Sequence, residues 1–255
     1  MEKDRTGICK LCLQEKYLLK ESHIFSAFLY REAGLLNDEK YAIVETKKLI
    51  EGTYVDGFPK ANPKSKGEFE GGILCESCDN KIIGTYETYA SQLLFHNSNC
   101  KQYQTGEGFK FSLCTNVDYT KFKLFVLSLL WRASISSRKA FGNVRLNSAV
   151  AEELRLMILN SDAKEFSKFP FLIYTHWNID ESEMPSDLFI PPIQMISPQG
   201  EMTYRFYMGG NFYDIFLGKI NPDLSPFVLN QEGELRIFHL QKYQADIMIK
   251  KIIEG

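Results

Sequence analysis

Ile73-Leu74-Cys75-Glu76-Ser77-Cys78 carries two cysteines separated by two residues, and the same spacing occurs earlier in the chain at Cys9-Lys10-Leu11-Cys12. A pair with this spacing presents two sulfur ligands from one tight turn, and two such pairs make the four-thiolate set that structural Zn²⁺ prefers. The second pair stands before a helical pattern, where the positive end of the helix dipole favours thiolates. One pair in a turn and one at the start of a helix predict a treble-clef zinc module.

The alternative for these four residues is two unrelated pairs of buried cysteines, which the doubled spacing disfavours. The first residues, MEKDRTG, are charged and lack the apolar core of a secretory signal, so we expect a cytoplasmic protein. Thiols stay reduced in that compartment, and paired cysteines there point to a metal rather than to disulfides. The two remaining cysteines, Cys100 and Cys114, are expected to be small buried hydrophobic residues.

The overall composition disfavours some classes of protein. The 255 residues are 44% hydrophobic and 24% charged, with a formal net charge of −2, as in an ordinary globular protein. Because no global positive field attracts nucleic acid, a protein that coats DNA non-specifically is disfavoured, whereas a compact nuclease with a local contact surface is not. The most apolar run, residues 124–131, is too short to cross a membrane. We therefore expect no membrane partner.

Two short segments beside the cysteine pairs point to a chemistry. Ser22-His23-Ile24 follows the first pair, and Asp79-Asn80-Lys81 follows the second pair directly. Over residues from about 7 to 90, this order resembles the HNH endonuclease family in its zinc-stabilised ββα-metal branch. The resemblance implies that zinc holds the fold, while a second ion, Mg²⁺ or Mn²⁺, takes part in the hydrolysis of phosphodiesters in nucleic acid, with DNA as the expected partner.

The resemblance also implies roles for two residues. His23 matches the general base that activates water, and imidazole suits this role because its unperturbed pKa lies near neutrality. Asp79 matches the position where the family places a ligand of the catalytic metal, usually His or Asn. A carboxylate there suits Mg²⁺, which prefers oxygen ligands. The alternative for His23 is a histidine that packs or hydrogen-bonds within the zinc module and has no chemical role.

The chain departs from the family pattern at two positions. Ser22 stands where the family often has an aspartate that also binds the metal. Glu70-Gly71-Gly72-Ile73 stands where the family has an asparagine that orients the histidine. Three acidic residues could replace that asparagine, namely Glu21, Glu70 and Glu87.

Glu87 is the one that we place in the candidate catalytic set with His23 and Asp79. It lies seven residues after Asn80, which brings the two side chains close to one helical face. From there its carboxylate could support the site. The alternative for Glu87 is an ordinary solvated helix residue.

Further along the chain, Trp131-Arg132-Ala133-Ser134 matches an element of uncharacterised bacterial proteins of this size, which resemble this chain in the cysteine pairs and the Ser-His-Ile segment. That resemblance implies an HNH-like protein from a prokaryotic defence (antiviral) or mobile-element setting. The same region is basic and partly aromatic and could contact phosphates. A charged loop between two core helices explains it equally well. Its members are Trp131, Arg132, Arg138, Lys139, Phe141 and Arg145.

The hydrophobic pattern divides the chain into two expected domains. Residues 1–98 would hold the zinc module, ββα-metal-like according to the resemblance, with a loop insertion rich in glycine and proline at about 50–72. Residues 115–255 would begin with a helical middle and end in a mixed or antiparallel β part, whose role the residues do not indicate. The expected fold class is therefore α+β.

Local patterns predict the individual elements. Apolar residues at helical spacing predict a short helix after Phe25 and longer helices over about 77–95, 118–135, 148–160 and 241–253, with Asp118 as an N-cap. Aromatic and β-branched residues predict strands over about 169–177, 188–196, 202–208, 212–217 and 235–240. Pro191 and Pro192 limit the second of these to an edge strand at best, and Gly209-Gly210 predicts a hairpin turn.

Two other functions remain open beside that of a nuclease. A non-catalytic zinc-binding module could recognise nucleic acid or a partner protein after losing the aspartate and asparagine of the active site. A subunit could instead dock onto an ATPase or another effector protein through its C-terminal β part. The sequence contains no phosphate-binding Walker motif, dinucleotide fingerprint or nucleophile elbow that would indicate another enzyme class.

Overall fold

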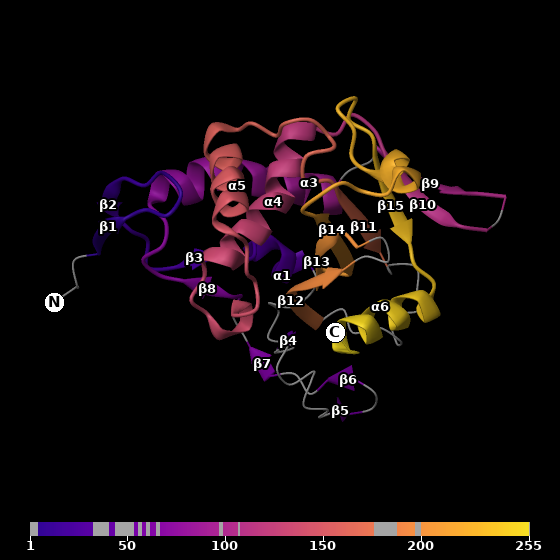
Figure 1. Cartoon of the computed structure of the whole chain (residues 1–255), viewed down its shortest axis with the longest axis horizontal. Coiled ribbons are helices and arrows are strands. Elements are labelled where there is room, and N and C mark those ends of the chain that lie inside the picture. The colour runs from indigo at the N-terminus through magenta and orange to yellow at the C-terminus, as the bar shows by residue number, and fades with distance from the viewer. Residues whose placement is uncertain are drawn as a thin grey trace.

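The structure, a computed structural model, describes residues 5–32, 41–43, 54–55, 58–59, 62–64, 67–96, 99–106, 108–175, 188–196 and 200–254. Within these ranges the chain forms one large mixed β-sheet with helices on both faces, joined to an N-terminal region of short two-stranded ribbons (Figure 1). The fold is therefore α+β, as the sequence predicts.

The large sheet contains nine strands in the order β7-β4-β12-β13-β14-β11-β15-β10-β9. Neighbouring strands run antiparallel, except that β4/β12 and β11/β15 are parallel. The strands are β4 Tyr41–Ile43, β7 Asn62–Lys64, β9 Cys100–Gln104, β10 Lys110–Cys114, β11 Phe171–Thr175, β12 Leu188–Ile196, β13 Met202–Met208, β14 Asn211–Phe216 and β15 Leu235–His239.

One face of the sheet packs against a layer of helices that contains the main core. In α4 every residue from Phe122 to Ala133 is buried, and most of them are apolar, as expected for a helix that is enclosed on all sides. Phe25 of the N-terminal region stacks on Phe141 and meets Phe206 of β13 edge-on, so distant parts of the chain share this core. The helices of this layer are α1 Ala27–Glu32, α3 Gly84–Phe95, α4 Tyr119–Ile135 and α5 Ser148–Asn160.

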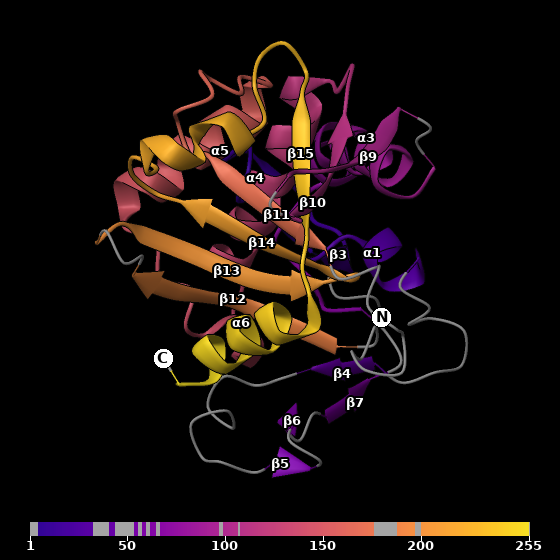
Figure 2. The ribbon, with the colours of Figure 1, turned by 90° about the vertical axis from the view of Figure 1, so that its right-hand side faces the viewer.

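The opposite face of the sheet, called the outer face below, carries two smaller elements. The C-terminal helix α6 (Lys242–Glu254) crosses it (Figure 2), and the 3₁₀ turn η4 (Pro222–Phe227) lies before β15. Each covers its own hydrophobic cluster, because Ala245 and Ile249 of α6 pack on Tyr207, while Val228 after η4 packs with Phe216. The outer face is therefore covered in two separate places.

The N-terminal region consists of short ribbons followed by a long helix. Its strands are β1 Thr6–Ile8, β2 Glu15–Tyr17, β3 Ser22–His23, β5 Tyr54–Val55, β6 Phe58–Pro59 and β8 Phe69–Glu70. The pairs β1/β2, β3/β8 and β5/β6 are antiparallel. The predicted helix over 77–95 begins as a π-helical turn, η1 (Ser77–Ile83), and continues as α3. Much of the predicted insertion at 50–72 lies outside the described residues.

Several local predictions are confirmed. Gly209 and Gly210 connect β13 to β14 with φ angles of +58° and +75°, as a two-residue hairpin turn requires. Asp118 caps α4, because its side chain accepts a hydrogen bond from the Lys121 N–H. Helix α6 occupies the predicted closing segment. Short-range signals of this kind depend only on neighbouring residues, which is why they can be read from the sequence.

The prediction that prolines confine 188–196 to an edge was wrong. Strand β12 pairs with β13 on one side and, at Leu188 and Phe189, with β4 on the other. Pro191 and Pro192 fall where the β12–β13 register shifts. A residue without an N–H group is tolerated at such an irregularity. Since β4 pairs only before the prolines, no bond to β4 is lost there.

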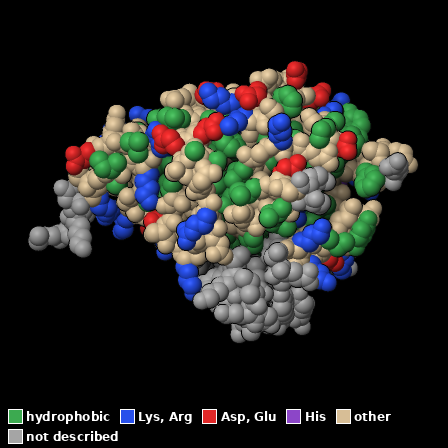
Figure 3. Space-filling model, in the orientation of Figure 1, with side chains coloured by type: hydrophobic (Ala, Val, Ile, Leu, Met, Phe, Trp, Pro, Cys, Tyr) green, Lys and Arg blue, Asp and Glu red, His purple; other side chains and the backbone are tan. Residues whose placement is uncertain are grey.

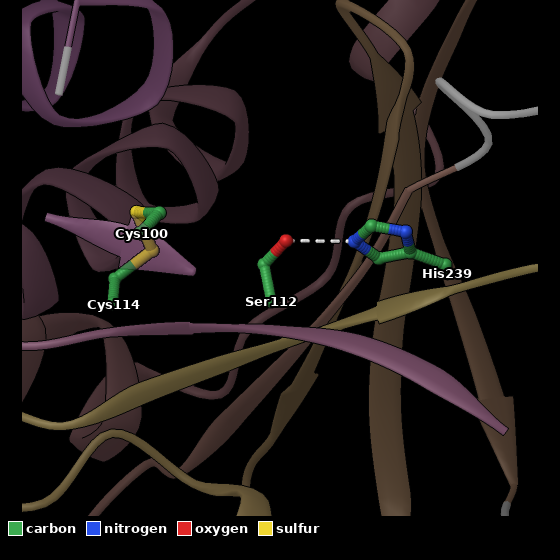
Figure 4. Close-up of a disulfide and its surroundings, with 4 residues drawn as sticks. All are labelled: Cys100, Ser112, Cys114 and His239. Carbon is green, nitrogen blue, oxygen red and sulfur yellow. Dashed lines mark hydrogen bonds between the residues drawn. A yellow bond between two sulfur atoms is a disulfide. The ribbon is translucent and has the colours of Figure 1, made fainter. Parts of the chain in front are cut away.

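The expectation that Cys100 and Cys114 are separate buried residues was also wrong, because the two form a disulfide (Figure 4). They face each other in register across β9 and β10, two strands that the sequence did not indicate. In the same view the Ser112 hydroxyl lies 2.7 Å from His239 Nε2, which connects β10 to β15. The disulfide therefore fastens the outermost hairpin of the sheet.

Removing this disulfide should lower the free energy of unfolding by about 3 kcal/mol, because a crosslink that closes a loop of about 15 residues restricts the unfolded chain by that amount. The two cysteines are 14 residues apart. The double variant Cys100→Ser, Cys114→Ser and the reduced wild type should melt together in scanning calorimetry, several degrees below the oxidised protein. Equal melting temperatures for all three samples would contradict the bond.

The sequence also led us to expect no membrane-spanning segment and a chain of two domains. No helix in the described part of the chain has the length and apolar character needed to cross a membrane. The division into domains 1–98 and 115–255 stays a prediction. Buried side chains from Cys9 to Leu235 belong to one hydrophobic cluster.

Candidate metal centre and neighbouring histidine strand

The four cysteines that the sequence pairs meet in space. Cys9 and Cys12 lie in the turn between β1 and β2, and Cys75 and Cys78 lie where η1 begins. The four Sγ atoms all lie within 4.8 Å of one another, so that the group could hold a metal ion. A donor set made only of sulfur suits zinc and other soft ions rather than Mg²⁺ or Ca²⁺.

Backbone hydrogen bonds bring the two pairs together. The Lys10 N–H donates to the Ile73 carbonyl at 2.9 Å, so the turn after β1 lies along the segment that enters η1. The Cys75 N–H donates to Cys9 Sγ at 3.4 Å. Leu13, which closes the first turn, adopts a left-handed conformation with φ of +57°. The geometry of the site is thus built by the backbone around it.

The surroundings do not favour four thiolates without a cation. Burial raises the pKa of Cys9 and of Cys78. Burial also acts to raise the pKa of Cys75, but hydrogen bonds from Ser77 and Cys78 outweigh it and lower this pKa to about 6. A divalent ion would compensate the negative charge and deprotonate the remaining thiols. The chemistry of these residues therefore fits a structural metal ion.

His23 ends the short strand β3, where it pairs with Phe69 of β8. Its ring meets the Phe69 ring edge-on at a centroid distance of 6.3 Å. Burial is the main reason that the pKa of His23 lies below its ordinary 6.5; Arg132 adds to this effect, while Glu87 and Glu21 oppose it. The imidazole is therefore neutral at pH 7, the form that a general base needs.

Asp79 follows Cys78 and lies in the π-helical turn, where its carbonyl oxygen accepts a hydrogen bond from the Gly84 N–H. Turns of this kind are frequent at functional sites. Burial raises the pKa of Asp79 to about 6, although Arg132 acts in the opposite direction. A cation would stabilise this desolvated carboxylate in its charged form. Within the described residues, Asp79 makes no hydrogen bond or ion pair with His23.

A buried arginine connects the strand of His23 to the helix of Asp79. Arg132 is 1% exposed, and its Nη1 donates to the His23 carbonyl at 2.8 Å and pairs with Glu87 Oε1 at 2.7 Å. Ser26 Oγ donates to the same Glu87 oxygen at 2.6 Å and lies 3.3 Å from Arg132 Nη2. Glu87 therefore belongs to the site as the partner of Arg132, and it is linked to the His23 backbone through that arginine.

Glu70 does not orient the histidine, because both of its carboxylate oxygens are engaged elsewhere. Oε2 accepts hydrogen bonds from Ser136 Oγ at 2.6 Å and the Ser137 N–H at 2.9 Å, and Oε1 accepts one from Ser137 Oγ at 2.7 Å. Glu70 thus fastens the end of α4 to β8. Ser22, opposite Glu70 in the ribbon, is fully buried, and its Oγ has no hydrogen-bond partner in the described part of the chain.

Of the two alternatives for the basic stretch, contact with phosphates is wrong for three of its members, which are buried. Trp131, Arg132 and Phe141 are each 1% exposed and belong to the core. The members at the surface are Arg138, Lys139 and Arg145. Arg138 lies over the Phe69 ring at 5.3 Å from its centroid and donates to the Phe69 carbonyl at 2.7 Å. One exposed cation of the stretch therefore lies directly beside the strand that pairs with His23.

Comparison with known proteins identifies no relative: no family model, no curated protein and no solved structure matches this chain. The site must therefore be understood from its own residues. Sequence reasoning missed Ser26, and it singled out Arg132 only as a residue that could contact phosphates, not as the buried partner of Glu87. The signal that could have shown the buried role of Arg132 is its place in a largely apolar helix, since a charged residue is rarely buried there without a partner.

Proposed function

We propose that this protein is an HNH-type endonuclease that uses zinc for structure and a divalent cation to hydrolyse phosphodiesters in DNA. The observation that carries the proposal is the order of elements: a cysteine turn, the antiparallel pair β3/β8, and a helix that begins at the second cysteine pair. This order resembles that of a treble clef with a ββα-metal core and supports the proposal. In the proposed site, His23 would act as the base and Asp79 would bind the catalytic metal.

In this mechanism neutral His23 takes a proton from a water molecule, and the water oxygen attacks the scissile phosphorus. The bond from phosphorus to the leaving oxygen breaks, and that oxygen takes a proton from solvent. Asp79 would hold Mg²⁺ or Mn²⁺ with few other protein ligands, since Mg²⁺ usually keeps several waters and binds substrate phosphate. When bound, the ion would stabilise the charge that develops on the phosphate and the leaving oxygen.

Exposed cations beside the site support contact with a nucleic-acid backbone despite the net charge of −2. Arg138 lies against β8, and Lys10 Nζ donates to the Ile135 carbonyl at the end of α4. Figure 3 shows several Lys and Arg side chains on the side of the molecule that carries the N-terminal ribbons. Such contacts would position DNA without reading its sequence.

A non-catalytic zinc module that binds nucleic acid or a protein is the second candidate. Two observations favour it, because the buried Ser22 and the engaged Glu70 occupy the positions of the family's aspartate and asparagine. A cytoplasmic location belongs to either proposal. In that reducing compartment the Cys100–Cys114 disulfide would be an uncommon feature.

The test of the proposed function is metal-dependent cleavage of supercoiled plasmid DNA. The wild type should nick and linearise the plasmid with Mg²⁺ or Mn²⁺, and His23→Ala should cut about 10²- to 10⁴-fold more slowly, the usual effect of losing a general base. His96 at the end of α3 is exposed, so His96→Ala is the matched control and should cut like the wild type.

Two outcomes decide between the candidates. Cleavage that survives His23→Ala unchanged would remove His23 from the mechanism. A wild type that contains zinc and binds DNA but cuts none with either ion would favour the non-catalytic module. Binding should then be the same for the wild type and for His23→Ala in a fluorescence-anisotropy titration.

A further inference from the structure

A cavity of about 350 Å³ lies on the outer face of the sheet, between helix α6 and the turn η4. This volume falls within the range of small-molecule sites. Strands β11 to β14 form its floor, and α6 and η4 form its sides. Its lining residues include Met195, Glu201, Arg205, Phe216, Leu224 and Lys251.

An ion pair lies on the floor of this cavity. Arg205 of β13 faces Asp214 of β14 in register, and its Nε and Nη2 bind Oδ1 and Oδ2 at 2.6 Å each. The side chains are only 14% and 5% exposed. Two charges at such a depth carry a desolvation cost that apolar residues would avoid. The pair therefore gives the floor of the cavity a buried, fixed charge pattern.

The pairing leaves one edge of the guanidinium unused. Asp214 occupies the edge formed by Nε and Nη2, while Nη1 has no hydrogen-bond partner in the part of the chain that the structure describes. The edge formed by Nη1 and Nη2 is a planar fork that matches a carboxylate or a phosphate. Asp214 fixes the orientation of Arg205, so this fork is held ready for a second oxyanion.

The walls add a second cation and an apolar surface. Lys251 of α6 lines the cavity and makes no ion pair with any described residue, whereas Glu201 contributes an opposing charge at the wall. Met195, Phe216 and Leu224 supply the apolar part. A ligand that fits all of these groups has a small apolar body and one oxyanion.

We propose that this cavity binds a small molecule with a carboxylate or phosphate on an apolar body, and that Arg205 and Lys251 hold its oxyanion. This site is independent of the histidine strand, because it lies on the opposite face of the sheet and is built from other elements. Arg205 recognises the oxyanion by geometry, and Lys251 adds charge at the opening.

Calorimetric titration of the full chain with three simple compounds tests the site. Benzoate and phenyl phosphate represent the two oxyanions, and benzyl alcohol is the neutral analogue. The favoured anion should bind at least about 10-fold more tightly than benzyl alcohol, since a charge-assisted contact is worth that factor or more. The stronger of benzoate and phenyl phosphate identifies the class of oxyanion.

Variants separate the site from non-specific binding. Lys251→Gln should weaken anion binding several-fold, while the neighbouring Lys250→Gln, which does not line the cavity, should have no effect. The exchange Arg205→Asp with Asp214→Arg keeps an ion pair but moves the guanidinium from β13 to β14. This variant should lose anion binding, while its circular dichroism spectrum stays that of the wild type. Equal binding of benzyl alcohol and both anions, or unchanged anion binding in the exchange and Lys251 variants, would overturn the proposal.

Discussion

Cys75→Ser is expected to abolish metal binding and to unfold the N-terminal region. Cys75 supplies a sulfur ligand whose pKa is lowered to about 6 by hydrogen bonds from Ser77 and Cys78, and serine in its place removes that sulfur. A structural zinc ion in small domains supplies about 10 kcal/mol or more of apparent folding free energy. That amount is comparable with the whole stability of an ordinary domain. Removing one ligand should therefore cost most of the stability of this region.

Two measurements test whether Cys75→Ser loses its zinc and its folded N-terminal region. Elemental analysis should find about one zinc ion per wild-type chain and much less in Cys75→Ser, and a strong chelator should reproduce the effect in the wild type. Hydrogen exchange should become fast at Leu18 and Leu19, whose N–H groups donate to the Arg5 and Leu74 carbonyls beside the cluster. The double variant Cys100→Ser, Cys114→Ser is the control and should keep its zinc. Full protection of the Leu18 and Leu19 N–H groups in metal-free Cys75→Ser would contradict the prediction.

Features that depend on neighbouring residues could be predicted from the sequence, and features that depend on distant partners could not. The cysteine spacing, the Gly209-Gly210 turn and the Asp118 cap are local patterns, and the structure contains each of them. The hairpin β9/β10 was missed because β9 reads Cys-Lys-Gln-Tyr-Gln, with four exposed residues out of five. An exposed strand at the edge of a sheet carries little hydrophobic alternation.

The same distinction holds within the candidate site. His23 and Asp79 follow recognisable motifs, so their positions could be predicted. The partner of Glu87 could not be predicted, because Arg132 is 45 residues away in a largely apolar helix and its sequence pattern points to no particular partner. Only the packing of α4 against α3 and the N-terminal strand brings the arginine to the His23 carbonyl. The partners of a buried charge are set by the tertiary packing, so they cannot be predicted from neighbouring residues in the sequence.

Arg132→Met should lower the free energy of unfolding by about 3–5 kcal/mol, because removing one partner of a buried ion pair leaves the other uncompensated. Glu87 would lose its cation, and the His23 carbonyl would lose its hydrogen bond. Urea denaturation of the two proteins measures the difference. Arg138→Met is the matched control, since Arg138 is exposed and contacts the Phe69 carbonyl and ring. It should cost no more than about 1 kcal/mol.

A second replacement separates the buried pair from the packing of the arginine stem. The double variant Arg132→Met, Glu87→Gln has no uncompensated carboxylate. Its loss of unfolding free energy should therefore be smaller than the sum of the losses in the two single variants, by a coupling energy of about 1–3 kcal/mol. The same double variant should still cut plasmid DNA more slowly than the wild type, because neither replacement restores the hydrogen bond to the His23 carbonyl. If the losses of unfolding free energy were additive, Arg132 and Glu87 would act independently. If the double variant cut plasmid DNA as fast as the wild type, the strand of His23 would keep its position without Arg132.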